Sequence, residues 1–383
     1  MKKIVAIFLF LFMALSMCSC AISEENEETK YYNSTECQTE TQTNRKDTVT
    51  DTTRRMPIDS SIENLINGVV TYMTYISENE ILFVVYEADS KNHIYTYNVA
   101  TKTMNDTGKS VNSDNLRYYE KGLITVDAQL LSESISVKKY DAAFDVASKK
   151  SYSDTAIFTR KFALSDNCNK LITTDSNIVL IHDFETDEDI TIEFSNEKYK
   201  PENVYAVTDS SFIFKSKYND GQDIYCFSDY NGNVTHTYIA GADCQVEANY
   251  NSFILIYDEA IDYLSSAVPG KCVLINKHTF EAKTVEFYSQ NSEGQTVTAS
   301  ENGKYVMTKC VAVETASADN PDFIYRFYSV NSGEMLLEIT INYLNYGSCY
   351  IFMDDLNKLV YIFRYDIESD AGEVNIYQMG EKQ

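Results

Sequence analysis

The stretch EILFVVYEADSKNHIYTYNVATKT, residues 80–103, decides the fold. An apolar run at 81–86 gives way to a polar break at 87–92, a second apolar run follows at 93–98, and a polar turn closes the unit at 100–102. Both runs are too short for helices, rich in β-branched and aromatic residues, and bounded by Asp, Asn and Ser. The stretch therefore predicts two half-buried antiparallel strands followed by a hairpin turn.

The same unit recurs along the chain. The end of its second strand gives a register mark, and successive marks lie roughly 42 to 53 residues apart, a period typical of four-stranded propeller blades. A third strand follows each polar turn, as at 190–194 and 335–339. The marks are Tyr97, Tyr140, His182, Phe227, Ile275, Tyr328 and Tyr377.

Two kinds of turn frame each unit. Turns such as 300–304 (SENGK) precede the apolar run, and turns such as 229–232 (DYNG) follow the register mark with the Asn, Asp and Gly that supply positive φ. In these turns the chain resembles WD-repeat-like and TolB-type β-propellers over about residues 58–383. Proline is absent from these turns, no Trp-Asp pair occurs, and the second unit, around 140–145, matches poorly. The resemblance implies a fold and no activity.

We therefore predict an all-β, seven-bladed β-propeller over residues 58–383, with eight blades as the alternative count. The seventh unit ends at 372–379 without an outermost strand, whereas 59–66 is a strand candidate that precedes the first unit. Pairing 59–66 with the last blade would close the ring and cover its edge. A two-layer sandwich is the rival fold, but sandwiches rarely run to this length with this period.

The first residues predict export. Residues 1–3 are positive and 4–15 form an apolar segment too short for a permanent anchor. The sequence LSMCSC at 15–20 resembles the lipobox of bacterial lipoproteins, which implies that Cys20, preceded by the small Ser19, carries the lipid.

Other processing sites remain open. Cys18 is the competing lipidation site, although it follows a methionine, and ordinary signal-peptidase cleavage after Ala21 is the competing route. With lipidation at Cys20, residues 1–20 are predicted to be a lipoprotein signal peptide.

The polar segment 21–57, which cannot bury enough apolar area to order itself, is predicted to be a flexible tether. We expect an exported protein that is lipid-anchored in the cell membrane and faces outward.

Composition excludes some partners and cofactors. The net charge of −25 and the lack of a basic stripe argue against nucleic acid. Four scattered histidines, no Cys-x-x-Cys pair and no complete calcium loop at 183–189 or 218–223 predict neither a metal nor another cofactor. The cysteines inside strand patterns, such as Cys226 and Cys272, read as small buried hydrophobes.

Loop length singles out one face. The connections between the apolar run and the strand that ends at the register mark are extended in the last three units, and in a propeller they would emerge side by side. Loops on a rigid scaffold are where binding residues tend to sit. The candidate binding residues are Asp258, Glu259, Asp262, Tyr263, Glu314, Asp322, Asp366, Glu368 and Asp370.

These features favour a surface-tethered binding or scaffolding protein that recognises an extracellular protein, peptide or glycan through one propeller face. No catalytic residue is predicted. The alternative is a propeller-class hydrolase, a glycosidase or lactonase, that works from carboxylates in the central funnel. A structural part of an envelope assembly is a third possibility. Paired funnel carboxylates would favour the enzyme, and a funnel lined by apolar and hydroxyl side chains would favour binding.

Overall fold

The computed structural model describes the folded part of the chain in segments. These are residues 48–49, 68–112, 115–119, 122–129, 134–153, 162–175, 177–194, 199–208, 210–217, 222–240, 244–247, 250, 252–258, 270–287, 292–312, 321–342, 348–366 and 371–380. Across these segments the named elements are all strands. No helix within them is long and apolar enough to cross a bilayer.

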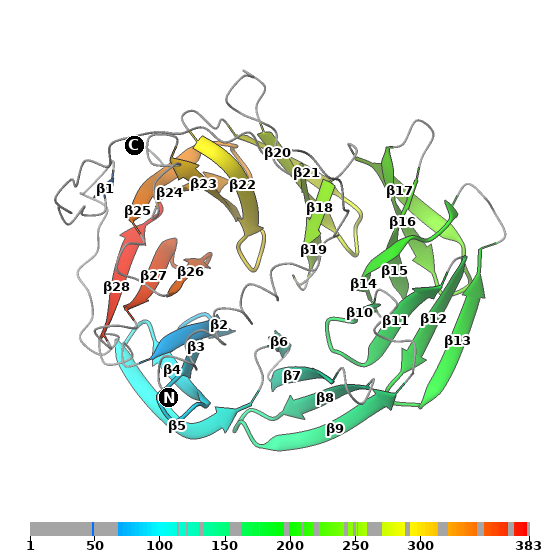
Figure 1. Ribbon diagram of the computed structural model, residues 1–383, viewed down its shortest axis with the longest axis horizontal. Coiled ribbons are helices and arrows are strands. Elements are labelled where there is room, and N and C mark those ends of the chain that lie inside the picture. The colour runs from blue at the N-terminus through cyan, green and yellow to red at the C-terminus, as the bar shows by residue number, and fades with distance from the viewer. Residues whose placement is uncertain are drawn as a thin grey trace, which may run out of the picture. The chain divides into compact units, whose positions relative to one another are not determined.

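Seven antiparallel sheets are arranged in a ring, and apart from one short N-terminal strand each is built from consecutive strands in sequence order (Figure 1). The prediction of an all-β, seven-bladed propeller is confirmed. We number the sheets as blades one to seven along the chain. In each blade the first strand lies innermost, against the central channel, and the last described strand lies outermost.

The strand bounds follow the repeat. Blade one is β2 (Val69–Ser77), β3 (Glu80–Tyr86), β4 (Asn92–Asn98) and β5 (Thr103–Val111); blade two is β6 (Leu116–Tyr119), β7 (Gly122–Gln129), β8 (Ser134–Tyr140) and β9 (Val146–Ser153); blade three is β10 (Phe162–Leu164), β11 (Lys170–Asp175), β12 (Ile178–Asp183) and β13 (Glu188–Glu193). Blade four is β14 (Asn203–Val207), β15 (Ser211–Lys217), β16 (Asp223–Asp229) and β17 (Val234–Ile239); blade five is β18 (Cys244–Glu247), β19 (Phe253–Asp258), β20 (Gly270–Asn276) and β21 (Ala282–Phe287). Blade six is β22 (Ser292–Ala299), β23 (Tyr305–Ala312), β24 (Asp322–Ser329) and β25 (Met335–Asn342), and blade seven is β26 (Ser348–Asp354), β27 (Leu359–Asp366) and β28 (Ala371–Gln378).

The register marks have a physical cause in the turns that follow them. In blades one to five, a side-chain oxygen at or just after the end of the third strand accepts a backbone N–H two or three residues on, as in an Asx-turn. The distances are 2.9 Å from Asn98 to Thr101, 2.9 Å from Asp141 to Ala143, 2.8 Å from Asp183 to Glu185, 2.9 Å from Asp229 to Asn231 and 2.8 Å from Asn276 to His278. Blade two, which matches the repeat poorly in sequence, therefore has the same turn as its neighbours.

Positive φ in these turns does not always come from the expected residue types. Glycine supplies it at Gly232 and Gly333, and aspartate at Asp187. Lys102, Phe144 and Phe280 occupy the same position with φ of 56°, 60° and 63°. The expectation of Asn, Asp or Gly is therefore wrong at these three turns, where the Asx bond holds a residue that favours negative φ.

Buried side chains join each blade to the next. The cluster between blades seven and one contains Phe83 and Tyr97 from blade one and Tyr361 and Phe363 from blade seven, with Phe83 and Phe363 in edge contact at 5.7 Å between ring centroids. Equivalent clusters lie at the other six junctions. Cys226 and Cys272 are fully buried in such clusters, as expected of small hydrophobes.

The predicted closing strand, 59–66, lies outside the described residues and stays a prediction, as do the bounds of the signal peptide and tether. In the described part of the chain, the sheet of blade seven has three strands. A two-residue strand within the predicted tether, β1 (Thr48–Val49), pairs instead with β25 of blade six, Thr48 opposite Thr340.

Candidate functional site

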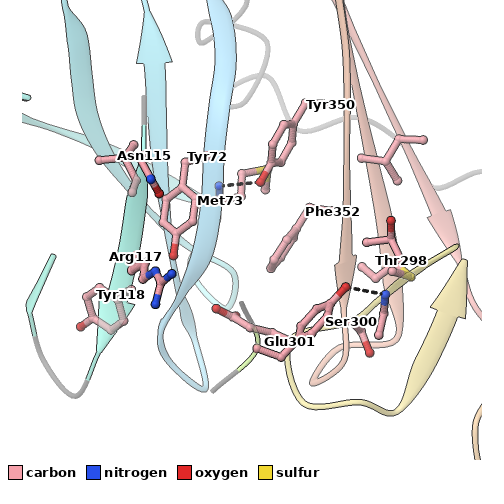
Figure 2. Close-up of a pocket in the computed structure, with 15 residues that line it drawn as sticks. Tyr72, Met73, Asn115, Arg117, Tyr118, Thr298, Ser300, Glu301, Tyr350 and Phe352 are labelled. Carbon is pink, nitrogen blue, oxygen red and sulfur yellow. Dashed lines mark hydrogen bonds between the residues drawn. The ribbon is translucent and has the colours of Figure 1, made fainter. Parts of the chain in front are cut away.

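A cavity of about 320 Å³ lies in the central channel (Figure 2). Its walls come from the inner strands of blades one, two, six and seven and from Tyr250 in the β18–β19 turn of blade five. Ligand pockets typically occupy about 300–1,000 Å³, so the cavity suits a small ligand or one unit of a larger one. The lining residues are Tyr72, Met73, Asn115, Leu116, Arg117, Tyr118, Tyr250, Thr298, Ala299, Ser300, Glu301, Tyr350, Ile351, Phe352 and Met353.

The cavity lies toward one end of the channel. Ser300 and Glu301 belong to the turn between β22 and β23, and Tyr250 to the turn between β18 and β19. Because every inner strand leads into such a turn, we call this side of the ring the turn face. The connections between second and third strands lie at the opposite end of each sheet. The cavity and the loops singled out by their length are therefore at opposite ends of the sheets.

Tyrosine hydroxyls cap backbone amides of the inner strands. The Tyr350 hydroxyl accepts the N–H of Met73 at 3.1 Å, and the Tyr250 hydroxyl accepts the N–H of Ala299 at 2.8 Å (Figure 2). Tyr250 in turn donates to Oε2 of Glu247 at 2.8 Å. These bonds satisfy donors on strand edges that face the channel, and they position both rings at the cavity wall.

Glu301 is the carboxylate among the lining residues. Its Oε1 accepts the Thr74 hydroxyl, and its Oε2 lies 3.5 Å from the N–H of Tyr75. Burial raises the pKa of Glu301 to about 6, and the two donors from blade one only partly oppose the effect of burial. Beneath it, the N–H of Asn302 donates to Asp355 Oδ2 at 2.7 Å, and burial raises the pKa of Asp355 as well.

Arg117 is the cation of the cavity wall, and it belongs to a small charged group. Close by, Lys277 Nζ and Asp166 Oδ1 form an ion pair of 2.7 Å that links blades five and three. Burial lowers the pKa of Lys277 and raises that of Asp166, while the attraction between the partners opposes both shifts. Arg117 interacts electrostatically with both members of the pair.

The residues predicted from loop length are placed only in part. Asp258 ends β19, Asp322 begins β24 and Asp366 ends β27, each at the end of its sheet away from the turn face. Asp322 and Asp366 are partly buried and belong to different blades. Glu259, Asp262, Tyr263, Glu314, Glu368 and Asp370 lie outside the described residues, as does Cys20, so the recognition patch and the lipidation site stay predictions.

The candidate metal residues have other local roles. His182 is buried between the rings of Tyr152 and Phe184, and its Nδ1 lies 3.0 Å from Asp189 Oδ1. In the acidic turns, Asp183 is paired with a lysine, and so is Asp223. Among the residues that the structure describes, no group of three His, Cys, Asp or Glu side chains could hold a metal ion.

Sequence reasoning missed the cavity. Its residues come from inner strands of blades far apart in the chain, and Glu301 reads in sequence as part of an ordinary polar turn. The abundance of tyrosine, 30 residues in all, was the available signal. It indicates strands with one face in solvent, but it does not indicate that four of the tyrosine rings face one channel.

Comparisons with known proteins concern the fold. No protein-family model matches the chain, and no curated protein matches it in sequence. Among solved structures, hydrazine synthase of Kuenenia stuttgartiensis is 11% identical at a TM-score of 0.41, over 81% of this chain and 95% of that one. The WD40 domain of SCAP from fission yeast is 13% identical at a TM-score of 0.39, over 79% of this chain and 82% of that one. Likenesses of this size concern the fold alone, which rests on the strand pairing described above.

Proposed function

We propose that this protein is an exported, surface-tethered binding protein whose channel cavity holds a neutral, hydroxyl-rich ligand, a glycan unit. The observation that carries the proposal is the cavity wall. Five aromatic rings and the hydroxyls of four tyrosines, Thr298 and Ser300 surround a space of about 320 Å³. Aromatic faces pack against the C–H faces of sugar rings, while hydroxyls both donate to and accept from sugar hydroxyls.

The cavity supports binding over hydrolysis. Glycoside hydrolysis in most families uses two carboxyl groups, about 5–9.5 Å apart, that flank the bond to be broken. One carboxylate, Glu301, stands among the residues that line the cavity, and both of its oxygens face donors from blade one. Asp355, the next carboxylate, is 2% exposed beneath the turn and is absent from the lining residues.

The capped strand edges favour a glycan over an extended peptide. Peptides that bind sheet edges do so through main-chain hydrogen bonds to unpaired N–H and C=O groups. At Met73 and Ala299 the N–H groups that face the channel are already bonded to tyrosine hydroxyls. Because Tyr350 accepts from Met73, its own O–H proton remains to donate to a ligand. Burial raises the pKa of Tyr350 to about 12, so that proton is present at neutral pH.

Binding is tested by titrating the full-length protein, purified in detergent, with neutral mono- and disaccharides in a calorimeter. Tyr350→Phe removes one hydrogen bond to the ligand and should weaken binding about tenfold. Tyr95→Phe is the matched control, because its hydroxyl bonds to Glu87 near the opposite end of blade one. Equal affinities for the wild type and Tyr350→Phe would contradict the placement of the ligand in the channel.

The tether is tested separately. Cys20→Ala should abolish the incorporation of labelled fatty acid and release the protein from the membrane fraction, whereas Cys18→Ala should leave both unchanged. The reverse pattern would move the lipid to Cys18, and loss in neither variant would favour ordinary secretion with cleavage after Ala21.

A further inference from the structure

A second cavity, of about 510 Å³, lies between blades one and two. Its residues come from the turn side of both blades: Glu80 begins β3, and 142–144 form the turn between β8 and β9. It therefore opens on the turn face, as the channel cavity does. The lining residues are Ile76, Glu80, Thr96, Asn105, Thr107, Tyr118, Ala142, Ala143 and Phe144.

Tyr118 lines both cavities. The residue is 9% exposed and packs in the core between blades one and two, against Leu82, Leu116 and their neighbours. Burial, and after it the charge of Glu80, raises the pKa of Tyr118, so its hydroxyl stays protonated. Tyr118 therefore stands between the channel cavity and the second cavity, which we call the interblade groove.

The chemistry of the interblade groove continues that of the channel. Thr96, Asn105 and Thr107 provide hydroxyl and amide groups, and Phe144 provides an aromatic ring. Thr107 donates to the carbonyl of Ile94 at 2.6 Å, which fixes its orientation. The ion pair between Lys109 and Asp145, at 2.5 Å, ties blade one to the turn that carries Phe144.

Charge further restricts the class of ligand that the groove can bind. Glu80 is the charged residue among those that line the groove, and the whole chain carries a net charge of −25. An acidic polysaccharide would meet repulsion from both, whereas a neutral one would not. The hydroxyl and amide groups suit sugar hydroxyls equally along the groove and in the channel.

We propose that the channel cavity and the interblade groove form one extended site for a neutral oligosaccharide, with one end in the channel and the following units along blades one and two. This inference rests on the proposed function, because it extends the same site. It adds that the ligand is an oligomer and that affinity rises with its length.

The test blocks the groove and leaves the channel open. Ala143 is exposed in the β8–β9 turn, so Ala143→Trp places a large ring in the groove without entering a core. Thr186→Trp is the matched control, since Thr186 is exposed at the equivalent position of the β12–β13 turn in blade three. Glucose, xylose and N-acetylglucosamine homopolymers, from monosaccharide to hexasaccharide, are titrated into the full-length wild type and both variants.

We expect wild-type affinity to rise with length, and Ala143→Trp to weaken hexasaccharide binding at least tenfold while leaving disaccharide binding unchanged. Thr186→Trp should match the wild type at every length. If Ala143→Trp does not fold, Asn105→Ala, at an exposed position of β5, should weaken only the longer ligands, about threefold.

Other outcomes separate the two proposals. If disaccharides bind but the affinity does not rise with longer saccharides, the extended site is overturned and the channel proposal stands. The same holds if Ala143→Trp binds the hexasaccharide as tightly as the wild type. No binding of any neutral saccharide, or tighter binding of an oligopeptide or an acidic oligosaccharide set, would overturn both.

Discussion

Two groups of polar contacts tie blades together at the turn face, and they are built in opposite ways. Lys277 of blade five, which is buried, forms an ion pair with the partly buried Asp166 of blade three. At the seam between blades six, seven and one, carboxylates accept bonds from uncharged donors instead: Glu301 from Thr74, Asp354 from Tyr75 at 2.9 Å, and Asp355 from the N–H of Asn302. Removing one partner of the ion pair leaves the other charge without compensation, whereas the seam is most stable when Glu301 is neutral.

The largest effect is expected at the ion pair. Asp166→Ala leaves the Lys277 ammonium buried without its partner and should lower the free energy of unfolding by roughly 3 kcal/mol. Replacing both residues, with Asp166→Leu and Lys277→Met, should recover most of the loss. Urea unfolding of the wild type, both single variants and the double variant measures the coupling. A double variant as unstable as Asp166→Ala would show that the contact does not depend on its charges.

A smaller effect, with its own pH dependence, is expected at Glu301. The pKa of Glu301 is raised from 4.5 to about 6 in the fold. The protonated carboxyl therefore stabilises the fold fully below pH 4.5, and this stabilisation is lost as the pH rises through about 6. That shift corresponds to about 2 kcal/mol. The free energy of unfolding of the wild type minus that of Glu301→Gln should therefore fall by about 2 kcal/mol between about pH 4 and about pH 7.5. A constant difference would refute the assignment, since Glu301→Gln keeps an acceptor and removes only the titration.

Tyr350→Phe tests the capping of the seam. The substitution leaves the N–H of Met73 without its acceptor, which should cost about 1 kcal/mol of stability. Tyr95→Phe serves again as the control, because the Tyr95 hydroxyl bonds to Glu87 and caps no backbone N–H of the seam. Thermal unfolding followed by circular dichroism measures both variants. Equal melting temperatures for the two variants would mean that water replaces the tyrosine at Met73.

The smallest effect is expected where an ion pair is exposed. Lys109 and Asp145 also join two blades, but their side chains are 38% and 63% exposed. Asp145→Ala should change the free energy of unfolding by less than about 0.5 kcal/mol, because solvent and salt screen such pairs. A loss as large as that of Asp166→Ala would show that the contribution of an ion pair to the free energy of unfolding depends on the contact and not on its burial.

The sequence was sufficient for the blades and insufficient for the site. Strand runs such as 81–86 and 93–98 are local signals, and the Asx oxygen that follows the mark in blades one to five fixes the register within a few residues. The cavity depends instead on pairs such as Met73 and Tyr350, which are 277 positions apart and meet only when the ring closes. Loop length gives no indication of such pairs, because the extended loops lie at the opposite end of the sheets.

The Asx-capped turns also bear on the order of folding. Their bonds span two or three residues, so each outer hairpin can form on the microsecond scale of isolated hairpins, independently of the rest. The contacts between blades one and seven join residues almost 280 positions apart, such as Tyr75 and Asp354. The entropy cost of closing this long loop must be met before these contacts can form. We therefore expect ring closure at this seam to be the slow step, and a substitution there should alter the folding rate more than one in any single turn.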